Sequence, residues 1–317
     1  MTTAEFIQEY REKDTRQLAL QSARFPDVDM PYALDQIKGW QTARRKLPTW
    51  AACDGIVYPP HLSMEQCSSE PTAQYKLNLA MEWARRVDHA SSMTDLTGGF
   101  GVDFSFTSCA FASATYVERN AQLCHMVEHN LPLLGIDNAK VVCADAVDYL
   151  STLDMQTMIF LDPARRDQHG AKTVMLADCT PDVVQLLPQL LKKSRFTMLK
   201  LSPMLDWHKA VEDLQGTVRE VHIVSVGGEC KELLLVLYEE IESELKVFCA
   251  DLEAGGSSLS SGSSSSSCSS LSSEHSFPRT PSSPSAPSSP SAPSNASLFV
   301  YTPGSARPAP HTKIKTK

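Results

Sequence analysis

Three glycines follow an acid in the stretch DLTGGFGVD, residues 95 to 103, and this spacing is typical of a ligand-binding turn. Gly98, Gly99 and Gly101 permit backbone conformations that other residues avoid, and they let a ligand approach the main chain. The apolar segment that follows predicts a helix, so amide groups of the turn and the helix start could donate to a ligand. A P-loop is excluded because no Gly-Lys-Ser/Thr follows, and Phe104 breaks the G-x-G-x-x-G pattern. A purely structural turn is the alternative.

Acidic residues stand at the ends of four successive expected strands: Asp95, Glu118, Asp145 and Asp162. Ligands of parallel sheets bind at the carboxyl ends of the strands. The separation of Asp95 from Glu118, 118 − 95 = 23, is close to the spacing at which an acid accepts hydrogen bonds from ribose hydroxyls. Four carboxylates disfavour a phosphate-rich ligand such as NAD. They favour a ligand with a ribose, an adenine amino group and a cationic centre, although each acid alone could cap a helix.

The elements that must position these residues alternate between strand and helix from residue 93 onward. The expected strands are 93–96, 114–117, 139–143, 157–161, 196–201, 218–226 and 233–238, and the expected helices are 103–109, 121–134, 146–152, 180–192 and 206–214. This alternation predicts a parallel α/β sheet that is covered by helices on both faces. Only GGECK separates the last two strands, so we expect an antiparallel hairpin at one edge of the sheet.

Composition divides the chain into three parts. Residues 1–74 have helical patterns with capping and proline signals, and they predict an N-terminal helical subdomain. Residues 75–250 carry the strand and helix alternation of a Rossmann-like domain. Residues 251–317 are rich in serine and proline, and we expect this tail to be disordered because it buries too little apolar surface.

The overall charge and the cysteines limit the function classes. A net charge of -8 argues against attraction of nucleic acid by the whole surface, although a local basic groove is compatible with it. The nine cysteines contain no C-x-x-C pair, and the spacing of the histidines predicts no metal site. The polar start MTTAEFIQEY and the lack of an apolar run near 20 residues favour a cytoplasmic protein without a membrane span.

The order and spacing of five stretches resemble class I S-adenosylmethionine-dependent methyltransferases: DLTGGFGVD, VERN, CADAVDYL, DPARR and KLSPMLD. Two others, EQCSSEPTAQYK and ECKELLL, resemble the bacterial branch that carries a C-terminal THUMP-like domain. The resemblance covers about residues 40 to 250 and implies a Rossmann-like, seven-stranded sheet whose final strand is reversed. The chain departs from it after residue 250, where the serine- and proline-rich tail stands in place of the THUMP-like domain.

This resemblance implies S-adenosylmethionine as the cofactor. The implied cofactor-binding residues are Asp95, Thr97, Gly98, Gly99, Gly101, Asp103, Glu118, Asp145 and Ala146. Within this set, Asp95, Gly99 and Gly101 would line the methionine end. Glu118 would hold the ribose, and Asp145 with Ala146 would meet the adenine.

The resemblance also implies the catalytic position. Asp162 and Pro163 match the place where amino-group methyltransferases carry Asp/Asn-Pro-Pro-aromatic, although no aromatic residue follows here. The acid would accept hydrogen bonds from the target NH₂ and position its nitrogen for methyl transfer. Arg165 and Arg166 would contact the substrate, by stacking or through phosphate, unless they pair with Asp167 or other carboxylates. We expect an exocyclic amine of an RNA base as the acceptor.

Three alternatives remain open from the sequence. An NAD- or nucleotide-binding Rossmann protein would use the same glycine turn and Glu118. A non-catalytic cofactor-binding module would keep the fold without transferring a group. The stretch ARRKLPTW, which ends at Trp50, could hold RNA, but a solvated helix end is the favoured interpretation because nearby acids balance its charge.

Overall fold

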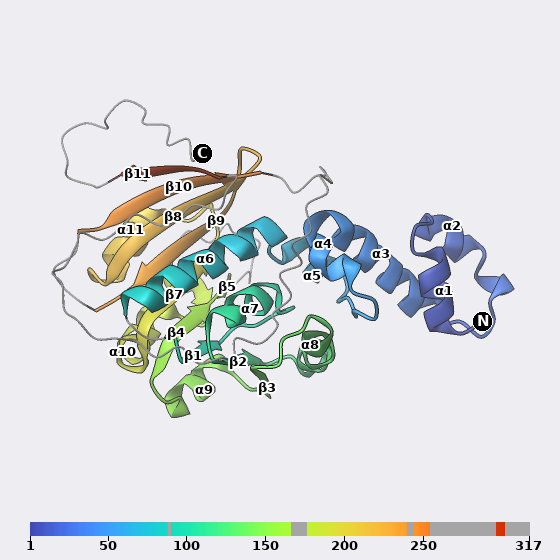
Figure 1. The fold of residues 1–317 in the computed structure, drawn as a ribbon, viewed down its shortest axis with the longest axis horizontal. Coiled ribbons are helices and arrows are strands. Elements are labelled where there is room, and N and C mark those ends of the chain that lie inside the picture. The colour runs from blue at the N-terminus through green and yellow to red at the C-terminus, as the bar shows by residue number, and fades with distance from the viewer. Residues whose placement is uncertain (88–89, 166–175, 240–243, 254–295, 302–317) are drawn as a thin grey trace, which may run out of the picture.

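The computed structural model describes residues 1–87, 90–165, 176–239, 244–253 and 296–301. A nine-stranded sheet lies at its centre, with the order β11-β10-β8-β9-β7-β4-β1-β2-β3 (Figure 1). The strands are β1 (Ser92–Asp95), β2 (Ser113–Glu118), β3 (Ala139–Cys143), β4 (Gln156–Leu161), β7 (Ser194–Leu201), β8 (Val218–Val226), β9 (Glu229–Leu237), β10 (Lys246–Leu252) and β11 (Ala296–Tyr301). Two short strands, β5 (Ala164–Arg165) and β6 (Cys179–Thr180), form a separate antiparallel pair.

Seven of the nine strands form the expected methyltransferase-type sheet. Strands β3, β2, β1, β4 and β7 run parallel to one another, and β9 inserts antiparallel between β7 and β8. Each expected strand of this set is present, with bounds shifted by a few residues at most, except that β9 begins earlier than expected, at Glu229. The predicted α/β fold class and the predicted hairpin are therefore confirmed.

The sheet differs from the expectation at the edge next to β8. There β10 pairs parallel with β8, and β11 pairs antiparallel with β10, so the hairpin β8–β9 lies inside the sheet and not at its edge. Strand β11 falls within residues 251–317, all of which we expected to be disordered. Its sequence ASLFVY is rich in residues that favour strands, but the serine and proline around it dominate the composition. The rest of the tail, 254–295 and 302–317, lies outside the described residues.

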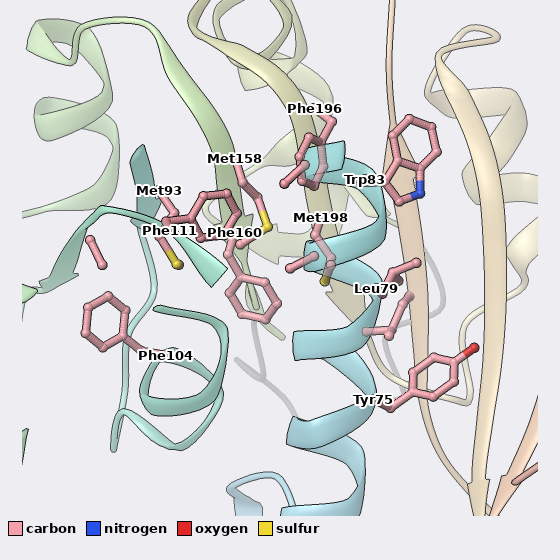
Figure 2. Close-up of a cluster of buried hydrophobic side chains, with 14 of the residues drawn as sticks. Tyr75, Leu79, Trp83, Met93, Phe104, Phe111, Met158, Phe160, Phe196 and Met198 are labelled. Carbon is pink, nitrogen blue, oxygen red and sulfur yellow. The ribbon is translucent and has the colours of Figure 1, made fainter. Parts of the chain in front are cut away.

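The two faces of the sheet are buried against different helices because side chains alternate along each strand. On one face, Met158 and Phe160 of β4 pack with Met198 of β7 toward α6 (Glu70–Arg86) and α7 (Val102–Thr107), as Figure 2 shows. Figure 2 also shows Tyr75, Leu79 and Trp83 of α6 at this layer. On the other face, Ile159 and Leu161 of β4 pack in a second cluster with α10 (Val183–Lys193) and α11 (Trp207–Asp213).

A buried polar group joins α6 to β8. Glu220 of β8 accepts hydrogen bonds from Trp83 Nε1 at 2.7 Å and from Arg86 at 2.5 Å. His222 Nε2 lies 3.2 Å from the same carboxylate, and its Nδ1 lies 2.8 Å from the Tyr75 hydroxyl. Burial by itself raises the pKa of Glu220. The combined effect of His222 and Arg86 is larger and opposite, and it lowers the pKa to about 2. The carboxylate is therefore held in its charged form inside the fold.

The N-terminal part is helical, as expected, and projects beyond the sheet (Figure 1). Its helices are α1 (Thr3–Tyr10), α2 (Thr15–Leu20), α3 (Met30–Lys46), α4 (Pro48–Ala52) and α5 (His61–Gln66). Asp14 caps α2 through the amides of Arg16 and Gln17. Helix α6 crosses residue 74, where we placed the domain boundary, and it continues across the sheet. One continuous helix thus links the N-terminal helices to the sheet.

The remaining helices follow strands β2 and β3. They are α8 (Ala121–Leu133) and α9 (Ala146–Thr152), and short 3₁₀ turns lie at Ser22–Arg24, Ser108–Ala110 and Leu176–Asp178. Among the residues that the structure describes, no helix is both long and apolar enough to cross a membrane.

Candidate functional site

A cavity of about 1080 Å³ lies at the carboxyl ends of β1, β2, β3 and β4. It is lined by every residue that we predicted to bind the cofactor: Asp95, Thr97, Gly98, Gly99, Gly101, Asp103, Glu118, Asp145 and Ala146. Asp162 and Pro163 line the same cavity. For the two predicted substrate residues the structure gives less: only the backbone of Arg165 is described, in β5, and Arg166 lies outside the described residues.

The glycine turn is shaped by close packing on Tyr116 of β2. A Cβ atom at Gly98 would lie 2.1 Å from the Tyr116 ring, so only glycine fits there without movement. The Gly98 amide donates to the Val117 carbonyl at 2.9 Å, and the Tyr116 hydroxyl donates to the Gly99 carbonyl. Gly99 has a φ of +55°, which glycine adopts without strain. The glycines thus serve the packing of the turn as well as its access to the cavity.

Phe100 anchors the same turn to the N-terminal helices. Its ring lies 4.8 Å from the ring of Trp50, centroid to centroid, and Trp50 is only 2% exposed. A buried ring offers no surface for a nucleic-acid base, so the structure excludes Trp50 as a stacking platform. The favoured interpretation, a solvated helix end, applies to Arg44 and Arg45, which are exposed, and not to the buried Trp50.

Glu118 is held at the end of β2 by two backbone amides. Its Oε2 accepts from the Gly99 amide at 3.1 Å, and its Oε1 accepts from the Asn120 amide at 2.8 Å. A carboxylate oxygen has capacity for a further hydrogen bond, so this acid is fixed in place and can still accept from a ligand. Asp145 caps α9 through the Val147 amide at 2.8 Å, and it lines the cavity as well. The capping and ligand-binding interpretations of Asp145 are therefore compatible.

Thr97 joins the ends of β1 and β4. Its amide donates to Asp95 Oδ1 at 2.9 Å, and its Oγ1 accepts from the Asp162 amide at 2.6 Å. Asp95 is 1% exposed, and burial raises the pKa of its carboxyl well above the usual value, with further contributions from Asp103 and Asp162. A cation that enters the cavity beside Asp95 would oppose this shift.

A chain of alternating charges extends from the cavity into the fold. Lys200 Nζ of β7 lies 2.6 Å from Asp162 Oδ2 and 3.2 Å from Asp103 Oδ2. Lys76 Nζ of α6 lies 3.1 Å from Asp103 Oδ1 and 2.5 Å from Glu232 Oε1. Three carboxylates and two ammonium groups therefore form one network, and four of its five members are almost completely buried.

Ser68, in the turn before α6, completes this network. Its hydroxyl donates to Asp103 Oδ2 at 2.7 Å and lies 3.3 Å from Lys76 Nζ. Ser68 also lines the cavity, together with Gln66 and Cys67. The N-terminal part of the chain therefore contributes directly to the wall of the site.

The network fixes the charge states next to Asp162. Burial by itself raises the pKa of Asp103. The combined effect of Lys76 and Lys200 is larger and opposite, and it lowers the pKa to about 2. Burial lowers the pKa of Lys200, but Asp162 and Asp103 raise it, so that it lies well above the usual value. Burial raises the pKa of Glu232, and Lys76 only partly opposes this. Lys200 is thus a permanent cation at neutral pH and cannot act as a general base.

Sequence reasoning missed Ser68, Lys76, Lys200 and Glu232 as site residues. All four stand in stretches that carry the family resemblance, EQCSSEPTAQYK, KLSPMLD and ECKELLL. The available signal was a charged residue inside an apolar strand, as in TMLKL and KELLL, because buried charges are almost always paired. Among the described residues, no group of three or more metal-binding side chains occurs.

Comparison with solved structures finds the same architecture. A candidate methyltransferase from Porphyromonas gingivalis W83 superimposes with a TM-score of 0.64 at 30% sequence identity. The match covers 78% of this chain, and this chain spans 60% of that one. A candidate RNA methyltransferase from Pyrococcus horikoshii matches with a TM-score of 0.44 at 13% identity, over 64% of this chain and 98% of that chain. Neither a protein-family model nor a curated protein matches the sequence.

Proposed function

Because the chain has the fold of the class I S-adenosylmethionine-dependent methyltransferases, we propose that it transfers a methyl group from S-adenosylmethionine to an exocyclic amine of an RNA base. The observation that carries the proposal is the convergence of Asp95, Glu118, Asp145 and Asp162 on one cavity. Each acid lies at the end of a different strand or within two residues of it, and the family resemblance predicts a ligand-binding or catalytic role for each.

The charge of the cavity favours this cofactor over a dinucleotide. Six carboxylates line it: Asp95, Asp103, Glu118, Asp145, Asp162 and Asp182. Among the residues that the structure describes, three cationic side chains line it: Arg119, Lys200 and Lys231. The pyrophosphate of NAD would meet repulsion there, whereas the sulfonium and ammonium groups of S-adenosylmethionine would be attracted.

The shape of the glycine turn fits a ligand that lies against the backbone. A Cβ atom at Gly99 would meet only the Thr97 carbonyl oxygen, at 3.8 Å, so this position faces open space. Glu118 stands beside it with capacity for ribose hydroxyls, and Asp145 can accept from an adenine amino group. When bound, S-adenosylmethionine supplies an electrophilic methyl group.

Asp162 is the residue that would receive the target amine. Its Oδ2 is engaged by Lys200, and its backbone amide by Thr97, so the carboxylate is fixed in orientation. An ionised carboxylate only accepts hydrogen bonds, so it favours an N–H donor over a carbon or carbonyl acceptor. Such a bond would direct the nitrogen lone pair toward the methyl group, which is a positioning effect.

The choice of RNA rests on the neutral amines of its bases and on the two arginines that follow Pro163 in the sequence, which suit a phosphate backbone. Transfer of labelled methyl groups to RNA from a strain without this gene, followed by nucleoside analysis, tests the proposal. We expect label in an N-methylated base, its loss in Asp162→Ala, and its retention in Asp148→Ala, an exposed acid on α9. Label only in protein, or in RNA at carbon or ribose oxygen, contradicts the amine assignment.

The cofactor site has a separate test. Glu118→Ala should weaken binding of S-adenosylmethionine by about 1.5–3 kcal/mol, the range for a hydrogen bond to a charged group, as measured by titration calorimetry. Glu128→Ala, an exposed acid on α8, is the matched control. Unchanged affinity in Glu118→Ala removes Glu118 from the site. Tight NAD binding would select the dinucleotide alternative, and cofactor binding without any transfer would select the non-catalytic module.

A further inference from the structure

Lys200 and Asp162 present a hydrogen-bond donor beside an acceptor on the cavity wall. An ammonium group has three N–H bonds, and Lys200 uses two of them, toward Asp162 at 2.6 Å and Asp103 at 3.2 Å. Within the described part of the chain, no third acceptor lies at Nζ and no donor lies at Asp162 Oδ1. Both side chains line the cavity, and that of Asp162 is 41% exposed.

We propose that this pair selects an amino group whose neighbouring ring atom is a hydrogen-bond acceptor, and that Lys200 is the specificity-determining residue. Asp162 Oδ1 accepts from the amine, and Lys200 Nζ donates to the adjacent ring nitrogen. Adenine, cytosine and guanine all carry such an amine beside a ring nitrogen. The inference rests on the proposed function, because it describes how the same site recognises its substrate.

The charge of Lys200 argues against an alkyl amine as the substrate. A lysine side chain or a protein N-terminus is largely protonated at neutral pH. Such a cation at Asp162 would lie beside the Lys200 ammonium, which Asp162 and Asp103 keep protonated. It would also have to lose a proton before its lone pair could react. A nucleobase amine is neutral and has neither obstacle.

The transfer itself balances with the groups present. The nitrogen lone pair forms the new N–C bond, while the electron pair of the C–S bond stays with the departing thioether. The N–H proton then passes to Asp162 Oδ1 and on to water. Lys200 takes no part in this proton transfer, so it acts on substrate binding and alignment alone.

The first test is the substitution Lys200→Met, with Lys209→Met on the exposed surface of α11 as the matched control. We expect kcat/KM for the RNA to fall about 10- to 100-fold in Lys200→Met, the equivalent of one hydrogen bond to a charged group. Lys200→Arg keeps a hydrogen-bond donor, so its kcat/KM for the RNA should fall by a smaller factor than that of Lys200→Met. Lys200 also lies 3.2 Å from Asp103, a predicted cofactor-binding residue, so in the Lys200 variants the dissociation constant of S-adenosylmethionine should rise by a smaller factor than kcat/KM falls.

The second test removes the acceptor from the substrate and leaves the protein intact. In RNA that carries a deaza analogue of the target base, a C–H replaces the ring nitrogen beside the amine. Wild-type kcat/KM should fall about 10- to 100-fold on this RNA, whereas Lys200→Met should show no further loss, because the two groups form one contact.

The outcomes separate the inference from the function on which it rests. Suppose that the wild type methylates a base amine but that the deaza analogue lowers kcat/KM by the same factor in the wild type and in Lys200→Met. The inference then fails and the proposed function stands. If Lys200→Met weakens cofactor binding as much as transfer, its role is structural and the inference fails. Transfer by the wild type to an alkyl amine, or to no amine, overturns the proposed function itself.

Discussion

Lys76→Met should destabilise the fold by leaving Glu232 without its cation. Lys76 Nζ is completely buried and lies 2.5 Å from Glu232 Oε1, whereas Asp103 keeps Lys200 and Ser68 as partners. Methionine retains most of the volume of the lysine side chain, so the loss is mainly electrostatic. Removing one member of a buried pair costs about 3–5 kcal/mol when the other stays charged.

Protonation of Glu232 limits this cost and makes it depend on pH. Binding a proton at pH 7 against an ordinary pKa of 4.5 costs about 3 kcal/mol, and at pH 5 it costs less than ~1 kcal/mol. A carboxyl whose folded pKa is raised destabilises the fold as pH rises, because the folded state then binds more protons than the unfolded chain. We therefore expect a loss of about 3 kcal/mol at pH 7 and of less than ~1 kcal/mol at pH 5.

Urea unfolding of the wild type and the variant between pH 5 and pH 8 measures this difference. The double variant Lys76→Met/Glu232→Met removes both charges and should lie within about 1 kcal/mol of the wild type, since replacing a buried pair by apolar groups is often neutral. A loss that does not change with pH, or a double variant less stable than Lys76→Met, would refute the electrostatic explanation.

Three further predictions concern other parts of the fold. The lowered pKa of Glu220, about 2, stabilises the fold above pH 4.5, and this contribution is lost as pH falls toward 2; Glu220→Gln should flatten the stability profile in that window in urea titrations. Gly98→Ala should lower the free energy of unfolding by about 1–3 kcal/mol through its clash with Tyr116, and Gly99→Ala by only about 1 kcal/mol through backbone strain. Equal decreases in the melting temperature of the two variants would contradict the packing argument. Because the pKa of Asp95 is raised, binding of a cation beside it should release the proton of the Asp95 carboxyl, so the affinity for S-adenosylmethionine should rise with pH. Calorimetry in buffers of different ionisation enthalpy should detect this proton release, and Asp95→Asn should abolish it.

The sequence predicted the parts of the site that depend on local pattern. Strand ends, the glycine turn and the acids that follow them are read from neighbouring residues, and Asp95, Glu118, Asp145 and Asp162 all line one cavity as expected. Their roles toward a ligand stay predictions. The alternation of strands and helices predicted the parallel strands, and the short turn GGECK predicted the hairpin of β8 and β9, whereas β10 and β11 beside β8 were not predicted.

The charge network could not be predicted in this way because its members are far apart in the chain. Lys76 comes from α6, Asp103 from α7, Lys200 from β7 and Glu232 from β9. Only the packing of α6 and α7 on one face of the sheet brings them together. No periodicity or spacing encodes these pairings, although the charge of Lys200 inside an apolar strand indicated that a partner must exist.

The outermost strand pair has a consequence for association between copies of the chain. Leu252 of β10 pairs with Ala296 of β11, and residues 253–295 separate them in the sequence. Closing so long a connection costs entropy, so β11 should detach at a lower free energy than the central strands. Its detachment would uncover the backbone amides and carbonyls of β10, which form a template for another strand. A long connection also lets the β11 of a second copy reach that edge, so exchange of this strand between copies is the association to look for at high protein concentration.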